Sequence, residues 1–129
     1  MRRLMVVIAL GLAALMQAQA EENRGSANYM LPLCKAWLKI AVERDLEAFK
    51  TILRKDPFRI TTAGMCAGVV VGIAETLRTF ALSCPPDGIT NEQLVRIVVS
   101  EVERHPERLH EDFIAPASAV IIGRWPCQK

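Results

Sequence analysis

The stretch "SCPPDGITNEQLVRIVVSEVERHPERLH", residues 83–110, decides the fold that this sequence predicts. It opens with a cysteine beside two prolines and a glycine, residue types that favour a turn and break a helix. Thr90 then stands three positions before Gln93, the capping-box spacing that starts a helix. His105-Pro106 ends that helix, because proline lacks the backbone N–H that a helix requires. The stretch predicts a rigid corner that carries a cysteine, followed by one helix.

The helical interpretation has to be weighed against a strand, because "VRIVV" (95–99) is rich in β-branched residues. Apolar residues recur at four-residue spacing, at Leu94, Val98 and Val102. Glu92 also stands four residues before Arg96, the spacing of a helix-stabilising ion pair. Since strict alternation with a period of two is missing, the pattern favours a helix with its valine stripe facing the core.

A longer helix precedes the corner, from about Thr62 to about Leu82. Apolar side chains recur along it at helical spacing, at Cys66, Val70, Ile73, Leu77 and Ala81. Glycines stand every four residues, at Gly64, Gly68 and Gly72. Each glycine costs roughly 1 kcal/mol inside a helix relative to alanine, but a glycine stripe lets another backbone approach closely. We therefore expect this helix to be the buried centre of the domain.

Two further helical regions flank these elements. The first begins near Leu31, with Pro32 in its first turn, and its pattern leaves open whether one helix or two reaches Leu53; Pro57 ends it. The last covers roughly 112–125, where Pro116 either starts a shortened helix or kinks a longer one. The sequence thus predicts an all-α fold, a small domain of four to five helices.

The N-terminus has the three parts of a secretory signal peptide. A basic start at Arg2 and Arg3 is followed by the apolar run "LMVVIALGLAAL" and by the small-x-small cleavage site Ala18-Gln19-Ala20. The apolar run is too short for a membrane span. We expect residues 1–20 to be removed and residues 21–129 to form one periplasmic domain without a membrane attachment.

Charge and size narrow the range of partners. Sixteen Lys and Arg residues become fourteen without Arg2 and Arg3, against fourteen Asp and Glu residues. A chain so close to neutral gives no electrostatic reason to expect nucleic acid as a partner. A domain of this length buries a modest core, so covalent cross-links are expected to matter.

All four cysteines, Cys34, Cys66, Cys84 and Cys127, follow the predicted cleavage site. An even number in a small exported chain indicates disulfides, and neither a C-x-x-C pair nor histidines at zinc-ligand spacing are present. We expect two disulfides, no metal and no cofactor. Cys66 and Cys84 lie some eighteen residues apart along one helix, roughly 27 Å, so they cannot pair unless that helix breaks.

Two pairings remain. If the last two helices form an antiparallel hairpin, Cys84 and Cys127 meet at its outer ends, which leaves Cys34 for Cys66. We favour this pairing over Cys34–Cys84 with Cys66–Cys127. With the cysteines bonded, His105 and His110 have no thiolate to activate, and structural roles at helix ends suit both better. No motif of nucleophilic or metal-dependent catalysis is present, so we do not expect an enzyme.

Four short motifs in series resemble one family. They are "CAGVVVGIAETL" (66–77), "CPPDGITNEQLVRIVV" (84–99), "HPERLH" (105–110) and "WPC" (125–127). In this order and spacing they resemble the Tai/Rap-type immunity proteins of type VI secretion, over roughly residues 62–127. The chain departs from the family pattern at Val69, Glu75, Pro116 and Trp125, and none of these departures changes the cysteine framework.

The resemblance implies a small exported helical protein that binds and blocks a peptidoglycan amidase effector in the periplasm, often as a homodimer. It also implies that exposed loops contact the toxin. The candidate contact residues are Pro85, Pro86, Asp87 and Gly88 in the first loop and Glu107, Arg108, His110 and Glu111 in the second. Two alternatives stay open at this point: a periplasmic stress or holdase-type binding protein on the same scaffold, and a thiol oxidoreductase.

Overall fold

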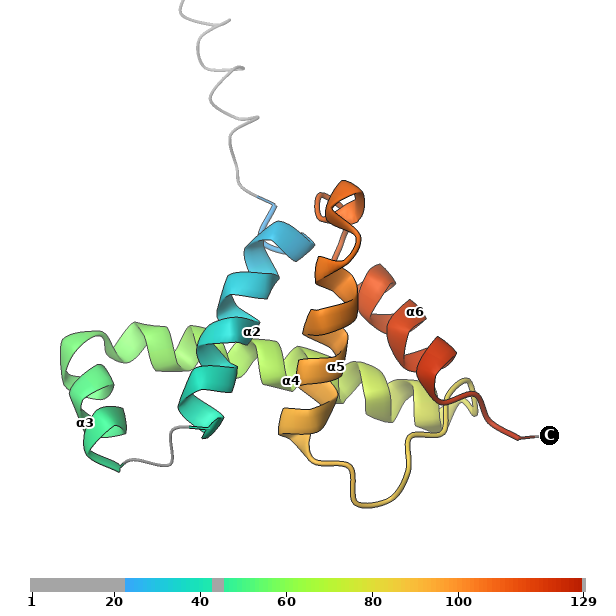
Figure 1. Ribbon diagram of the computed structural model, residues 1–129, viewed down its shortest axis with the longest axis horizontal. Helices are drawn as coiled ribbons and strands as arrows, with labels where there is room; N and C mark the ends of the chain where they lie inside the picture. The colour runs from blue at the N-terminus through green and yellow to red at the C-terminus, as the bar shows by residue number, and fades with distance from the viewer. Residues whose placement is uncertain (1–22, 43–45, 129) are drawn as a thin grey trace, which may run out of the picture.

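The structure, a computed structural model, describes residues 23–42 and 46–128 (Figure 1). In chain order its elements are α2 (Ala27–Val42), α3 (Leu46–Lys55), α4 (Pro57–Thr79), α5 (Asn91–Glu103), the short 3-10 helix η1 (Pro106–Arg108) and α6 (Ile114–Arg124). The predicted all-α class is confirmed. Extended pairing among the described residues is limited to an isolated bridge between Ser26 and Asp112. The predicted signal peptide, residues 1–20, lies outside the described residues.

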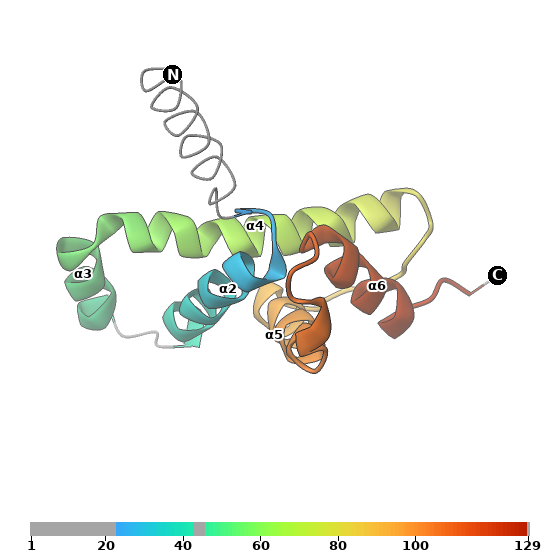
Figure 2. The same cartoon turned by 90° about the horizontal axis from the view of Figure 1, so that it is seen from above.

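The helices form two layers (Figure 2). α4 is a long rod that makes up one layer, and α2, α5 and α6 lie across one side of it as the other layer. α3 packs against α4 near the end of the rod where α4 begins. The last turn of α4 and the tail after α6 lie at the opposite end. α4 thus contacts every other α-helix that the structure describes.

The core fills the space between the two layers. Small residues dominate the face that α4 buries, which is made of Ala63, Cys66, Ala67, Val70, Ala74 and Leu77. α5 faces it with the predicted valine stripe and two more residues, namely Leu94, Val95, Val98, Val99 and Val102. Phe113 and Ile121 complete the core from the α6 side, and both are almost fully buried. Burying a side chain of this size contributes roughly 1.5–3 kcal/mol, so this shared face is the main source of stability.

The glycine stripe of α4 does not lie in that core. Gly64, Gly68 and Gly72 are exposed, and a Cβ atom built at any of the three meets no atom within 4 Å. No backbone of residues 23–42 and 46–128 packs on the stripe, so the close approach that the glycine spacing suggested does not occur within the described chain. The physical reason is that Cys66, Val70 and the small alanines define a narrower buried face on the other side of the helix. By length and composition α4 is also the one described helix that could cross a membrane, yet it packs on the four other described α-helices.

Two disulfides connect the layers. The first joins Cys34 of α2 to Cys66 of α4, with Cα atoms 5.1 Å apart and both residues fully buried. The second joins Cys84, after α4, to Cys127, after α6, with Cα atoms 4.9 Å apart. This is the pairing that the length of the central helix and the predicted hairpin favour. No described cysteine is free.

One helix start differs from the sequence prediction, and two questions that the sequence left open are answered. α4 begins at Pro57 instead of near Thr62, because the Asp56 carboxylate caps the new helix by accepting from the Arg59 N–H at 3.1 Å. The first helical region is two helices, α2 and α3, with residues 43–45 outside the described part. Pro116 starts a shortened helix instead of kinking a longer one, since it is the third residue of α6.

The start of α2 also lies earlier than predicted. It begins at Ala27 instead of near Leu31, so Pro32 lies inside the helix and not in its first turn. The first backbone N–H groups of a helix have no partner within the helix. Here the Ala27 N–H donates to the Glu111 carbonyl at 3.0 Å and the Asn28 N–H to the Leu109 carbonyl at 2.8 Å. A distant segment therefore satisfies this helix end together with a local cap, since the Ser26 hydroxyl accepts from the Tyr29 N–H at 3.4 Å.

The predicted start and end of α5 are confirmed. The Thr90 hydroxyl accepts from the Gln93 N–H at 3.1 Å, and the Gln93 side chain accepts from the Thr90 N–H at 2.9 Å. Glu92 and Arg96 form the expected ion pair at 2.8 Å. The helix ends at Glu103, just before His105-Pro106.

We expect the buried disulfide to contribute more stability than the outer one. Replacing Cys34 and Cys66 together by alanine removes a cross-link worth about 4 kcal/mol in loop entropy and also leaves a cavity between α2 and α4. Replacing Cys84 and Cys127 removes a cross-link of similar entropy at a more exposed site. Urea unfolding measures both free energies, and equal losses for the two double variants would contradict this expectation.

Ala81 offers a second test, because it is the one described residue other than glycine with a positive φ, 52°. It follows the cap residue of α4, where the Ala81 N–H donates to Arg78 and the Leu82 N–H to Leu77, the hydrogen-bond pattern of a Schellman motif. Ala81→Gly should raise the free energy of unfolding by about 1 kcal/mol. The matched control, Ala119→Gly in the exposed middle of α6, should lower it by about the same amount.

Candidate functional site

The first predicted contact loop, residues 85–88, connects α4 to α5 and has a defined shape. The Ile89 N–H donates to the Pro86 carbonyl at 3.3 Å, and Gly88 occupies the left-handed region at φ 89°, which the turn requires. Pro85 is buried, whereas Pro86, Asp87 and Gly88 are exposed. The buried Pro85 therefore packs against the domain, and the three residues after it project into solvent.

Arg78, near the end of α4, forms hydrogen bonds with this loop. Its guanidinium donates to the Asp87 carboxylate at 3.2 Å and to the Pro85 carbonyl at 3.1 Å. One side chain thus reaches both ends of the turn. Nothing local in the sequence marks Arg78 for this role, which arises because the chain folds back over the end of α4.

Ser83 anchors the corner itself. Its side chain is fully buried, and its hydroxyl oxygen lies 2.9 Å from the Ile121 carbonyl and 2.8 Å from the Trp125 carbonyl. The Cys84 N–H also donates to the Trp125 carbonyl at 2.8 Å. Together with the Cys84–Cys127 disulfide these bonds fasten the loop to the end of α6. Ser83 was not singled out from the sequence, where nothing local distinguishes it from a surface serine.

The second predicted segment, residues 107–111, follows α5. Arg108 donates two hydrogen bonds to Glu111, at 2.9 and 2.8 Å, and this contact lowers the pKa of the Glu111 carboxyl and raises the pKa of Arg108. A hydrogen bond with its own backbone lowers the pKa of Glu107, which also contacts His105 at 3.2 Å. Both carboxyl groups therefore stay ionised to lower pH than an isolated glutamate.

His110 does not have the role expected from the sequence. Its side chain is exposed, and the start of α6 is satisfied by Asp112, whose carboxylate accepts from the Ile114 N–H at 3.0 Å. Asp112, and not His110, caps the start of α6, because an aspartate two residues before a backbone N–H can form a local Asx-type hydrogen bond. His110 remains a candidate contact residue by position alone.

The two predicted segments lie at opposite ends of α5 (Figure 1). A helix of this length separates them by roughly 20 Å, so they do not converge on one point. The face between them contains a groove of about 810 Å³ between α5 and α6. Its lining, which defines the α5–α6 groove, comprises Arg96, Ile97, Ser100, Glu101, Val102, Arg104, His105, Arg108, Pro116, Ala119, Val120, Gly123 and Arg124.

The groove connects the two predicted segments. A smaller hollow of about 390 Å³ is lined by residues 86–89 with Gln93 and Ile97. Ile97 lines both hollows, and Arg108 lines the far end of the groove. Loop 85–88, the groove and segment 107–111 therefore form one surface along α5.

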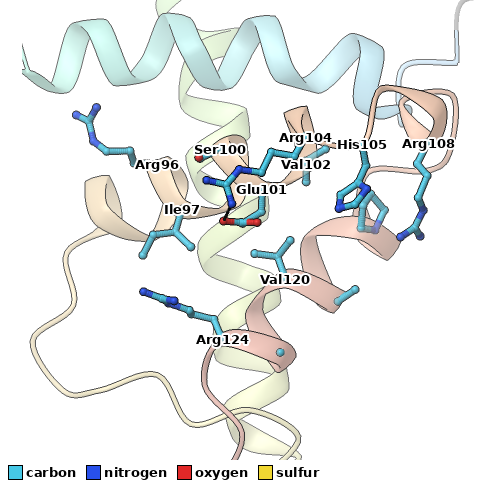
Figure 3. A pocket seen from close by; sticks show the side chains of 13 residues that line it. Arg96, Ile97, Ser100, Glu101, Val102, Arg104, His105, Arg108, Val120 and Arg124 are labelled. Atoms are coloured by element: carbon cyan, nitrogen blue, oxygen red, sulfur yellow. Dashed lines mark hydrogen bonds and ion pairs between the residues drawn. The ribbon is translucent and has the colours of Figure 1, made fainter.

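The groove has an apolar centre and basic edges (Figure 3). Ile97 of α5 and Val120 of α6 lie in its middle, and both are partly buried. Four arginines surround them, at positions 96, 104, 108 and 124, against a single lining carboxylate, Glu101. These arginines come from three elements and follow no motif, so sequence reasoning missed the groove.

Three of the four arginines already have acidic partners within the chain. Arg96 pairs with Glu92, Arg104 with Glu101 and Arg108 with Glu111, at 2.8–2.9 Å. All three pairs are solvent-accessible, so water screens them and each contributes little to stability. Arg124 is exposed and has no acidic partner among residues 23–42 and 46–128. The groove thus presents the guanidinium of Arg124 without an acidic partner in the described chain. The other three arginines can give up their weak intrachain ion pairs for a carboxylate of a binding partner.

The described residues do not form a metal centre. No three His, Cys, Asp or Glu side chains in this part of the chain gather closely enough to hold a metal ion. The fold and the groove together describe a small disulfide-linked helical protein with a surface suited to binding another chain. The model of one family, the Rap1a immunity proteins, matches residues 26–127.

This chain therefore belongs to the Rap1a immunity protein family. The match extends beyond the region of the sequence resemblance, since it includes α2 and both disulfides. Immunity proteins generally act by binding an effector protein and not by catalysis. Searches of curated proteins and of solved structures found no match.

Removing the Arg78 side chain should loosen loop 85–88 without unfolding the domain. In Arg78→Ala the exposed contact to Asp87 and the partly buried contact to Pro85 are both lost, so hydrogen exchange at the Ile89 amide should accelerate by about fivefold. Arg96→Ala is the matched control, because it removes an ion pair of α5 that does not touch the loop. Unchanged exchange at Ile89 in Arg78→Ala would show that the turn holds its shape alone.

Proposed function

We propose that this chain is a periplasmic immunity protein that binds and inhibits a peptidoglycan amidase effector of type VI secretion. The observation that carries the proposal is the family match over residues 26–127, which makes the chain an immunity protein. The amidase comes from the closer resemblance of the four motifs between residues 66 and 127. Neither the target nor the compartment follows from the family alone.

The predicted signal peptide and the disulfides support a periplasmic location. Peptidoglycan lies outside the cytoplasmic membrane, so a protein that protects cells from a peptidoglycan amidase has to be exported. The predicted signal peptide supplies the export route, and disulfides such as Cys34–Cys66 form in oxidising compartments like the periplasm. Both features agree with a target in the cell wall.

Inhibition would follow from binding alone. The continuous surface formed by loop 85–88, the α5–α6 groove and segment 107–111 runs the length of α5. A stable protein complex usually buries about 800 Å² on each partner, an area for which a single loop is too small. We therefore assign the effector contact to this whole surface, which would cover the amidase cleft and exclude its substrate.

Protection of cells tests the proposal. The proposal predicts that an amidase is encoded beside this chain's gene. Directed to the periplasm, this neighbouring amidase should lyse cells, and co-expression of the full chain should prevent lysis. The same chain without residues 1–20 should fail to protect, because it stays in the wrong compartment. The purified oxidised domain should bind that amidase with a Kd in the nanomolar range or below and abolish its hydrolysis of peptidoglycan.

Two outcomes would contradict the proposal. Protection by the chain without its signal peptide would remove the periplasmic assignment. Failure of the oxidised domain to bind the neighbouring amidase would remove the amidase assignment. Suppression of the aggregation of unrelated unfolded proteins, in the absence of amidase binding, would favour the stress-protein alternative.

A further inference from the structure

We infer that the α5–α6 groove receives an acidic segment of the effector, with an Asp or Glu carboxylate at Arg124 and an apolar side chain over Ile97 and Val120. The inference rests on the proposed immunity function and specifies which chemistry the partner has to present.

The groove is lined mainly by basic side chains, although the predicted mature chain as a whole is close to neutral. The predicted mature chain carries equal numbers of acidic and basic residues, so a random surface would show both signs. The groove lining instead has four arginines and one glutamate. Glu92 and Glu111, the partners of Arg96 and Arg108, do not line the groove. The carboxylates that pair with Arg96 and Arg108 thus lie outside the groove lining. Within the lining, Glu101 is the single carboxylate beside four guanidinium groups.

Arg124 is the residue best placed for a partner's carboxylate. It lies in the last turn of α6, is exposed and has no acidic partner in the described part of the chain. Its side chain extends over the groove toward Ile97 (Figure 3). A guanidinium can bind a carboxylate through two parallel hydrogen bonds, which a lysine cannot do.

The position of Arg124 has a simpler explanation that the test has to exclude. Basic residues are favourable in the last turn of any helix, because they interact with the negative end of the helix dipole. Lysine serves that purpose as well as arginine. A helix-end role therefore predicts that Arg124→Lys is neutral, whereas bidentate binding of a carboxylate predicts weaker effector binding.

The apolar centre sets the second requirement. Ile97 and Val120 are only partly buried in the free chain, and both line the groove. Protein ligand sites span about 300–1,000 Å³, so a groove of about 810 Å³ takes a short segment rather than one ion. An apolar side chain beside the carboxylate would complete the burial of both residues.

The experiment measures the Kd for the neighbouring amidase with four forms of the oxidised domain. Arg124→Glu should raise the Kd by at least about tenfold and make it less sensitive to salt, because a charge-assisted contact is lost. Arg124→Lys should raise it by about threefold to fivefold. Arg54→Glu is the matched control, since Arg54 is exposed and lies in the last turn of α3 at the far end of the molecule. It should change the Kd by less than about twofold.

Charge reversal in the partner completes the test. Each surface Asp and Glu of the amidase is changed to Lys in turn, and one such change should restore binding to Arg124→Glu. Thermal unfolding checks that the variants stay folded. Wild-type binding with no effect of Arg124→Glu would overturn the inference and leave the proposed function intact. Loss of binding without rescue by any reversal would exclude an acidic segment.

Two further outcomes have separate meanings. If the wild-type domain does not bind the amidase, the proposed function fails and the inference falls with it. If Arg124→Glu instead changes self-association in sedimentation velocity, and amidase binding is unaffected, the groove is an interface between copies of this chain. That result would also overturn the inference.

Discussion

The Cys34–Cys66 bond is the constraint on which the other contacts of this fold depend. It holds α2 across α4 at a Cα separation of 5.1 Å, and small residues around the crossing let the two helices pack closely. Ala63, Ala67 and Ala74 are the small residues on the buried face of α4. With α2 in place, its first N–H groups reach the carbonyls of Leu109 and Glu111, so the segment after α5 is positioned by the same crossing. One covalent bond therefore orders elements that are far apart in the chain.

The candidate binding surface is held at both ends by contacts that the core does not provide. At one end the buried Ser83 hydroxyl and the Cys84–Cys127 bond fasten the loop after α4 to the end of α6. At the other end the first N–H groups of α2 donate to the carbonyls of Leu109 and Glu111 in segment 107–111. α5 and α6 are thus fixed relative to each other, and a groove between them keeps its shape before any partner arrives. Such preorganisation favours tight binding because little ordering is left to be done on association.

The helices and the cysteine pairing could be predicted from the sequence because their signals are local or geometric. Thr90 and Gln93 mark a helix start within four residues, and the length of the central helix excludes a Cys66–Cys84 bond. Pro57 was interpreted only as a helix end, although Asp56 before it carries the capping signal for α4. The groove could not be predicted, since its arginines are brought together by the packing of α5 on α6. The exposure of the glycine stripe depends on which face of α4 the other helices choose, and periodicity alone does not decide that.

The order of the two disulfides along the chain divides the molecule into two covalent rings. The first closes between residues 34 and 66 and the second between 84 and 127, so the rings neither overlap nor enclose each other. A protease that cuts once inside either ring leaves both pieces linked through sulfur. A single cut between residues 67 and 83 releases two separate polypeptides. The second half of α4 is therefore the covalent weak point of the molecule, and its protection relies on the helix staying wound.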